Sequence, residues 1–62
     1  MENKSISVVL TRDDAWNLAL FLKRVGWNEI RENAQDDAEA EAIRTANERA
    51  QAALAEAGYA PR

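Results

Sequence analysis

The chain has 62 residues with no cysteine and no histidine, a formal net charge of −3, and a hydrophobic content of 47% that includes 13 alanines. Such a chain forms one domain at most, and without disulfides or an ordinary zinc site a partner chain is the remaining means of stabilising it. The acidic balance disfavours nucleic acid and acidic membranes as partners, no apolar run approaches the roughly 20 residues of a membrane span, and no signal-peptide core is visible, so we expect a soluble cytoplasmic protein.

One segment alone reads as a β-strand: residues 5–11, SISVVLT. Ile6, Val8 and Leu10 alternate with other side chains, and this period of two with many β-branched residues is typical of a half-buried strand. A single strand cannot satisfy its own backbone hydrogen bonds. We therefore expect it to pair antiparallel with its own copy across the two-fold axis of a homodimer.

A helix is predicted for residues 12–25. The pattern TRDD is typical of an N-terminal capping box, in which the Thr11 hydroxyl accepts a hydrogen bond from the amide of Asp14. Lysine and arginine in the last turn suit the negative end of the helix dipole. Gly26 is expected at the left-handed position after the helix, with Trp27 packing back on the last turn.

The second half of the chain is predicted to be helical over residues 37–57, where alanine, glutamate, arginine and glutamine dominate. Asp36 opens this helix with a second capping box, DDAE. Gly58 and Tyr59 end it, with glycine at the left-handed position and an aromatic side chain after it. The intervening residues 27–35 are open between a turn and a short helix.

The expected fold class is α+β and mostly helical: a single β-α-α domain over residues 1–62, with one N-terminal strand and two main helices. The first helix carries more apolar surface than one strand and one alanine-rich helix can cover, so part of it is expected in the subunit interface. The second carries a narrower stripe at the 3-4-3-4 spacing of a coiled-coil seam, formed by Ile43, Ala46, Ala50, Ala53 and Ala57. The candidates for the dimer interface are Ile6, Val8, Leu10, Trp16, Leu20 and Phe21.

No constellation of catalytic residues is visible in the sequence. Histidine, cysteine and a glycine-rich phosphate loop are all missing, and carboxylates without a base, a nucleophile or a metal make a poor active site. We therefore predict no enzymatic activity, no cofactor, no bound metal and no small-molecule substrate.

An acidic run is the main candidate for binding a partner. Residues 29–48 hold seven acids against Arg31 and Arg44. One interpretation is a patch that docks on a basic partner, and the other is helix capping combined with a solvated helix face. Trp16 and Trp27 are further candidates, since tryptophan often anchors protein interfaces, although packing in the core or at helix ends also accounts for them. The acidic candidates are Glu29, Glu32, Asp36, Asp37, Glu39 and Glu41.

A strand, a capped helix, a glycine and then WNEIREN, over residues 5–34, resemble the ribbon-helix-helix DNA-binding fold. In that family two strands pair across a dimer axis, and a segment like EIRE, here residues 29–32, opens the second helix. The resemblance implies a strand-paired dimer. It favours DNA binding less, because the outward side chains of this strand are serine, valine and threonine, which carry no charge to engage phosphates.

As a whole the chain also resembles small proteins encoded by bacteriophages and prophages, through the run FLKRVGW and the ending ALAEAGYAPR. This resemblance implies an accessory protein that binds and modulates a host factor. The leading expectation is therefore a non-enzymatic protein-binding module, an inhibitor or modulator of a host bacterial protein or defence complex. The alternatives are a ribbon-helix-helix transcriptional regulator or antitoxin, and a purely structural oligomerisation module.

Overall fold

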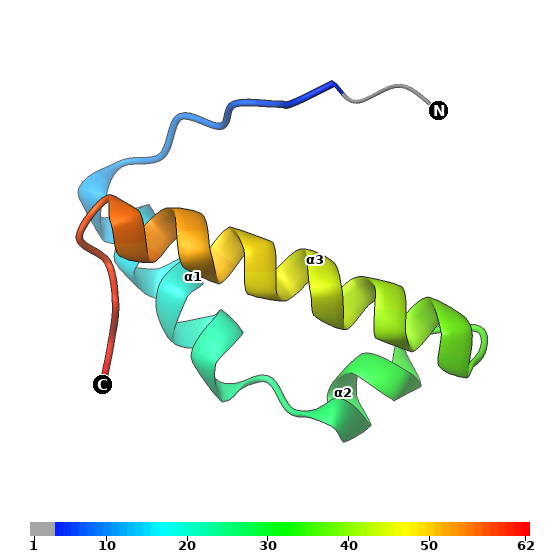
Figure 1. The fold of residues 1–62 in the computed structure, drawn as a ribbon. Helices are drawn as coiled ribbons and strands as arrows, with labels where there is room; N and C mark the ends of the chain where they lie inside the picture. The colour runs from blue at the N-terminus through cyan, green and yellow to red at the C-terminus, as the bar shows by residue number, and fades with distance from the viewer. Residues whose placement is uncertain (1–3) are drawn as a thin grey trace.

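The computed structural model describes residues 4–62, which form three helices and no β-strand (Figure 1). The helices are α1, Arg12–Arg24; α2, Trp27–Glu32; and α3, Asp37–Glu56. α3 packs against both shorter helices, which follow one another along its length. Residues 4–10 form a separate extended segment that leaves the start of α1 and lies to one side of α3, and we call this segment the arm. None of the helices in the described part of the chain has the length and apolarity that crossing a membrane requires.

The β-strand expected at residues 5–11 is absent from the described chain, so the α+β prediction is wrong and the fold is all-helical. Ile6, Val8 and Leu10 nevertheless share one side of the arm, since all three line the same groove against the helices. The alternation in the sequence therefore corresponds here to a one-sided apolar arm and not to the predicted strand. A strand also needs a neighbouring strand to complete its hydrogen-bond ladder, and the described residues of this chain provide none.

The start of α1 follows directly from its local sequence. The Thr11 hydroxyl accepts a hydrogen bond from the amide of Asp14 at 3.0 Å, as the TRDD pattern predicts. Asp13 and Asp14 occupy the first turn, and Lys23 and Arg24 occupy the last one, so charges of the favourable sign lie at both ends of the helix dipole.

The junction between α1 and α2 differs from the prediction at Gly26. This residue has φ −104°, which is an ordinary value, and it is the N-cap of α2 instead of a left-handed residue after α1. Its amide donates to Oε1 of Glu29 at 2.7 Å. Trp27 is consequently the first residue of α2. The side chain of Glu29 reaches back to the cap amide, and this is the half of a capping box that glycine leaves possible.

Both ends of α3 are capped by the residues that the sequence indicates. Oδ1 of Asp36 accepts from the amide of Glu39 at 2.8 Å. At the other end Gly58 adopts φ +100°, and the amide of Tyr59 donates to the carbonyl oxygen of Leu54 at 2.8 Å. This is a Schellman motif, in which a left-handed residue lets the chain turn back over the end of the helix.

The core is small and is built mainly from alanine. Its buried members are Ala15, Ala19 and Leu22 of α1, Ile30 of α2 and Ala40 of α3. Ala40 is completely buried, which permits α2 and α3 to approach closely. Among the described residues, only Leu22 and Ile30 place large side chains in the core, so burial within one chain supplies limited hydrophobic stabilisation.

The side of α3 that packs against α1 and α2 is not the alanine seam that the sequence predicted. Ala40 is buried and Ile43 and Leu54 are half-buried, whereas Ala46 and Ala53 of the expected seam are exposed. At 100° per residue, the seam is centred well to one side of the direction in which α1 and α2 lie. Part of the small-residue stripe therefore faces away from the helices of its own chain.

Candidate functional site

Large apolar side chains lie mostly outside the core. Val9 is 98% exposed and Phe21 is 60% exposed, and both are larger than any of the three core alanines. We use the term apolar surface for the exposed large apolar residues of the arm and α1. They are Ile6, Val8, Val9, Leu10, Trp16, Leu18 and Phe21. Large apolar side chains exposed in such number mark interaction sites in soluble proteins.

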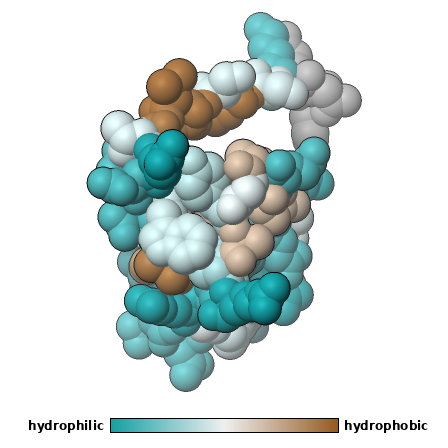
Figure 2. All heavy atoms as spheres, turned by 90° about the vertical axis from the view of Figure 1, so that its left-hand side faces the viewer, coloured by the Kyte–Doolittle hydropathy of each residue, from teal (hydrophilic) through white to brown (hydrophobic). Residues whose placement is uncertain are grey.

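An open groove lies between the arm and the helices. Figure 2 shows the apolar side chains of the arm, in brown, spanning an opening above the body of the molecule. The groove has a volume of about 480 Å³. Its lining consists of Ile6, Val8 and Leu10 of the arm, Ala15 and Leu18 of α1, Ala50, Ala53, Leu54 and Ala57 of α3, and Tyr59.

The arm and α1 line the groove mainly with bulky side chains, whereas α3 lines it mainly with alanine. Alternate side chains of the arm form one wall, and Leu18 stands on α1 opposite them. Along α3 the lining is mainly alanine, and it includes the part of the seam that α1 leaves uncovered. Because none of the lining side chains carries a charge, the groove suits large apolar groups and offers nothing to an ionic ligand.

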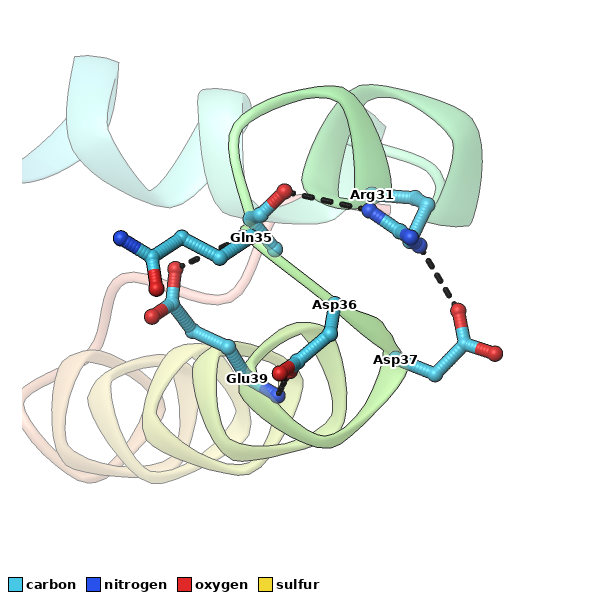
Figure 3. Close-up of polar contacts among 6 residues, drawn as sticks. Arg31, Gln35, Asp36, Asp37 and Glu39 are labelled. Carbon is cyan, nitrogen blue, oxygen red and sulfur yellow. Dashed lines mark hydrogen bonds and ion pairs between the residues drawn. The ribbon is translucent and has the colours of Figure 1, made fainter.

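Most of the acidic candidates have structural partners within the chain. Asp36 caps α3, and Glu39 accepts a hydrogen bond at Oε1 from the amide of Gln35 at 3.1 Å (Figure 3). Asp37 pairs with Arg31, whose Nε lies 2.7 Å from Oδ1. Arg31 also donates from Nη1 to the carbonyl oxygen of Ala34 at 3.1 Å, so it joins the end of α2 to the start of α3.

The remaining acidic residues are divided between α2 and α3. Glu29 caps α2 through Gly26, and Glu41 pairs with Arg44 at 2.7 Å between Oε2 and Nη2. Glu32 lies exposed on α2. The structure thus brings the acidic candidates into one region around the α2–α3 junction, where most of them fix helix ends. Docking of a basic partner there stays a prediction.

The two tryptophans lie in different surroundings. Trp27 is 38% exposed, and the guanidinium carbon of Arg44 lies 5.6 Å from the centre of its ring, which is a cation–π contact. Trp16 is also partly exposed. It lies on the flank of α1 opposite Phe21, because these two residues are separated by about 140° around the helix axis.

The candidates for the dimer interface do not form one continuous patch. Ile6, Val8 and Leu10 line the groove, and Phe21 is exposed on the same flank of α1 as Leu18. Trp16 and Leu20 face the other flank, where Leu20 is half-buried. Reasoning from the sequence did not single out the groove. The spacing of the alanine seam was the signal for it, but that signal does not say which element covers the seam.

Among the described residues no group of acids is placed to hold a metal ion. A family of unknown function (DUF7706) matches residues 1–62. The chain belongs to this family. No curated protein and no solved structure gives a significant match to the chain. Membership of DUF7706 therefore assigns no activity, and a function has to be argued from the apolar surface and the groove.

Proposed function

We propose that this member of DUF7706 is a non-enzymatic protein-binding module that contacts its partner through the apolar surface. The single observation that carries the proposal is the distribution of large apolar side chains. The core contains two of them, Leu22 and Ile30, whereas the apolar surface contains seven. Burying one such side chain contributes about 1.5–3 kcal/mol, so more hydrophobic free energy is available from association than from the core of one chain.

The acidic residues have roles within the chain itself, so the proposal does not rely on them for binding a partner. Capping and ion pairing at the α2–α3 junction give Asp36, Asp37 and Glu39 a structural purpose that needs no partner. Glu32 is the acidic candidate whose charge can be reversed without removing a cap or an ion pair of the described residues. The proposal therefore places the main contribution to binding on the arm and α1.

The finer form of the proposal is that the partner is a host bacterial protein or defence complex, which the module inhibits or modulates. Its support is the resemblance of the sequence to phage and prophage accessory proteins. The DNA-binding alternative has no supporting observation, because paired strands contact DNA in the family concerned and the described residues contain no strand. Net charge −3 also disfavours phosphate contacts.

The test is affinity capture from a bacterial lysate with quantitative mass spectrometry, comparing the wild-type chain with Val9→Ser and Trp16→Ser. Both residues lie outside the groove lining and outside the core, so we expect both variants to keep the helix content of the wild type by circular dichroism. We expect the captured partner to fall at least about tenfold for one of the two variants, because interface anchors are commonly worth 2 kcal/mol or more.

Glu32→Lys is the matched control on the acidic side. We expect it to capture the same partner at the wild-type level. If it abolishes capture while both apolar variants retain it, the acidic region is the binding site and the proposal is wrong. The same conclusion follows if the wild-type chain captures no protein above a scrambled-sequence control.

A further inference from the structure

The chain exposes more surface than a compact protein of its mass. Its accessible surface is 5342 Å², whereas a compact monomer of 6.9 kDa exposes roughly 4,000 Å². The three residues outside the described part account for at most about 500 Å², the area of three residues in an unfolded chain. An excess of about 800 Å² therefore belongs to residues 4–62, which is of the same order as the area that one partner contributes to a stable interface.

The overall dimensions agree with this excess. The Cα atoms extend 34 × 30 × 15 Å with a radius of gyration of 12.7 Å, against roughly 10.6 Å for a compact domain of this length. The molecule is a thin slab, and the arm holds apolar side chains apart from the helices across the groove (Figure 2). A second layer of protein against the groove would restore ordinary compactness.

We infer that a second copy of this chain covers the groove, with Phe21 of each copy entering the groove of the other. This deepens the proposed function, on which it rests, by naming one partner of the apolar surface. In a two-fold dimer the same patch faces itself, so one chain must carry both the protruding group and the recess. Phe21 follows Leu18 by one turn on the flank of α1 that borders the groove, and it is the largest of the strongly exposed apolar side chains.

The α3 side of the groove is suited to receive an aromatic ring. Ala50, Ala53 and Ala57 leave space there because each has only a methyl side chain, and Ala53 is exposed in the single chain. They belong to the 3-4-3-4 seam, a pattern that permits close packing against another helix. Ala53 and Ala57 are exposed in the single chain, whereas Ala50 is half-buried, so the outer part of the seam is available to a second copy.

Charge and availability favour a second copy as the occupant. The groove lining carries no charged side chain, so two chains of net charge −3 can meet there without placing like charges in contact. The described residues bury five apolar side chains and the chain has no cysteine, so a partner that is present wherever the chain is synthesised suits its stability best. A second copy meets that requirement under all conditions of expression.

The first test is sedimentation equilibrium over a range of micromolar concentrations. We expect the wild-type chain to sediment at twice 6.9 kDa. Phe21→Ser removes the interface anchor, and Ala53→Glu places a charged side chain in the recess that receives it, so each should weaken dimerisation by at least about thirtyfold. Trp16→Ser, on the opposite flank of α1, should dimerise like the wild type. Circular dichroism verifies that all three variants are folded.

A second test locates the contact itself and uses the lack of native cysteine. One preparation carries Phe21→Cys and the other carries Ala53→Cys, and the two are mixed under mild oxidation. We expect a disulfide-linked heterodimer between the preparations, whereas a mixture of Trp16→Cys with Ala53→Cys should give none above background. Equal cross-linking in both mixtures would contradict the assigned geometry.

The outcomes separate this inference from the proposed function. A wild-type chain that is monomeric at all concentrations overturns the dimer, even if it captures another protein through Val9 or Trp16. A dimer that survives both Phe21→Ser and Ala53→Glu also overturns it. Conversely, a dimer that depends on Phe21, together with capture of no other protein, supports the inference and limits the function to self-association.

Discussion

Gly58→Ala is the sharpest test of how the C-terminal end of α3 is built. Gly58 has φ +100°, and a methyl group at its Cβ position would meet no heavy atom within 4 Å. The substitution therefore gains no packing contact and adds only the strain of a left-handed backbone, about 1–2 kcal/mol for a residue with a Cβ atom. In a domain of this size, 1 kcal/mol lowers the melting temperature by roughly 4–8 °C.

The assay is thermal unfolding followed by circular dichroism at 222 nm, a wavelength that reports helix content. All variants are compared at one protein concentration, because the stability of a dimer depends on concentration. We expect Gly58→Ala to lower the melting temperature by roughly 4–16 °C, in proportion to that strain. The hydrogen bond from the amide of Tyr59 to the carbonyl oxygen of Leu54 depends on the left-handed conformation of residue 58. The last turn of α3 should therefore also lose helix content before the main transition.

Gly26→Ala is the matched control. Gly26 has φ −104°, which alanine adopts freely, and its Cβ would meet Oε1 of Glu29 at 3.1 Å, at the end of a flexible side chain. Alanine lowers the conformational entropy of the unfolded chain, and this stabilising effect offsets the close contact with Glu29. We therefore expect the free energy of unfolding to change by no more than about 0.5 kcal/mol. Equal stability of Gly58→Ala and the wild type would refute the Schellman end, and equal destabilisation by both substitutions would refute the distinction between the two glycines.

Three further predictions concern the core and the α2–α3 junction. Ile30→Ala removes one of the two large core side chains of the described residues and should lower the free energy of unfolding by about 2–5 kcal/mol, as measured by urea titration. A decrease below about 1 kcal/mol would contradict the burial of Ile30. Asp36→Ala removes the cap of α3 and should cost about 0.5–2 kcal/mol in the same titration, whereas Glu32→Ala should change stability by less than about 0.5 kcal/mol. Asp37→Asn breaks an exposed ion pair with Arg31 and should cost less than about 1 kcal/mol, so a loss as large as that of Ile30→Ala would show that the pair is far more important than its exposure indicates.

Local features of this fold were predictable because they depend on a few neighbouring residues. Thr11 and Asp36 accept the hydrogen bonds that open α1 and α3, and each does so from an amide three residues ahead. Gly58 ends α3 in the left-handed conformation for the same local reason. Gly26 shows the limit of this reasoning, since a glycine after one helix can equally cap the next, and the carboxylate of Glu29 decides between them.

The candidate site was predictable only in part. Exposure of apolar side chains on α1 was expected from the width of its apolar stripe, and Phe21 is indeed exposed. The groove was not foreseen, because it requires the arm to stand away from α3 and the seam of α3 to lie off the α1 contact. The acidic residues drew attention as a cluster, yet the use of Asp36 and Asp37 at the α2–α3 junction is visible only once that junction is built.

The sequence by itself determined the two longer helices and the caps at Thr11, Asp36 and Gly58, since propensity and capping act over a few residues. It could not determine whether the arm would become a strand, because a ladder needs a partner backbone and alternation does not specify one. The tertiary structure alone decided which side of α3 meets α1 and α2, because helices choose their contact by the fit of side chains on both surfaces. That choice leaves Ala53 and its neighbours of the seam on an open groove and places the arm above them.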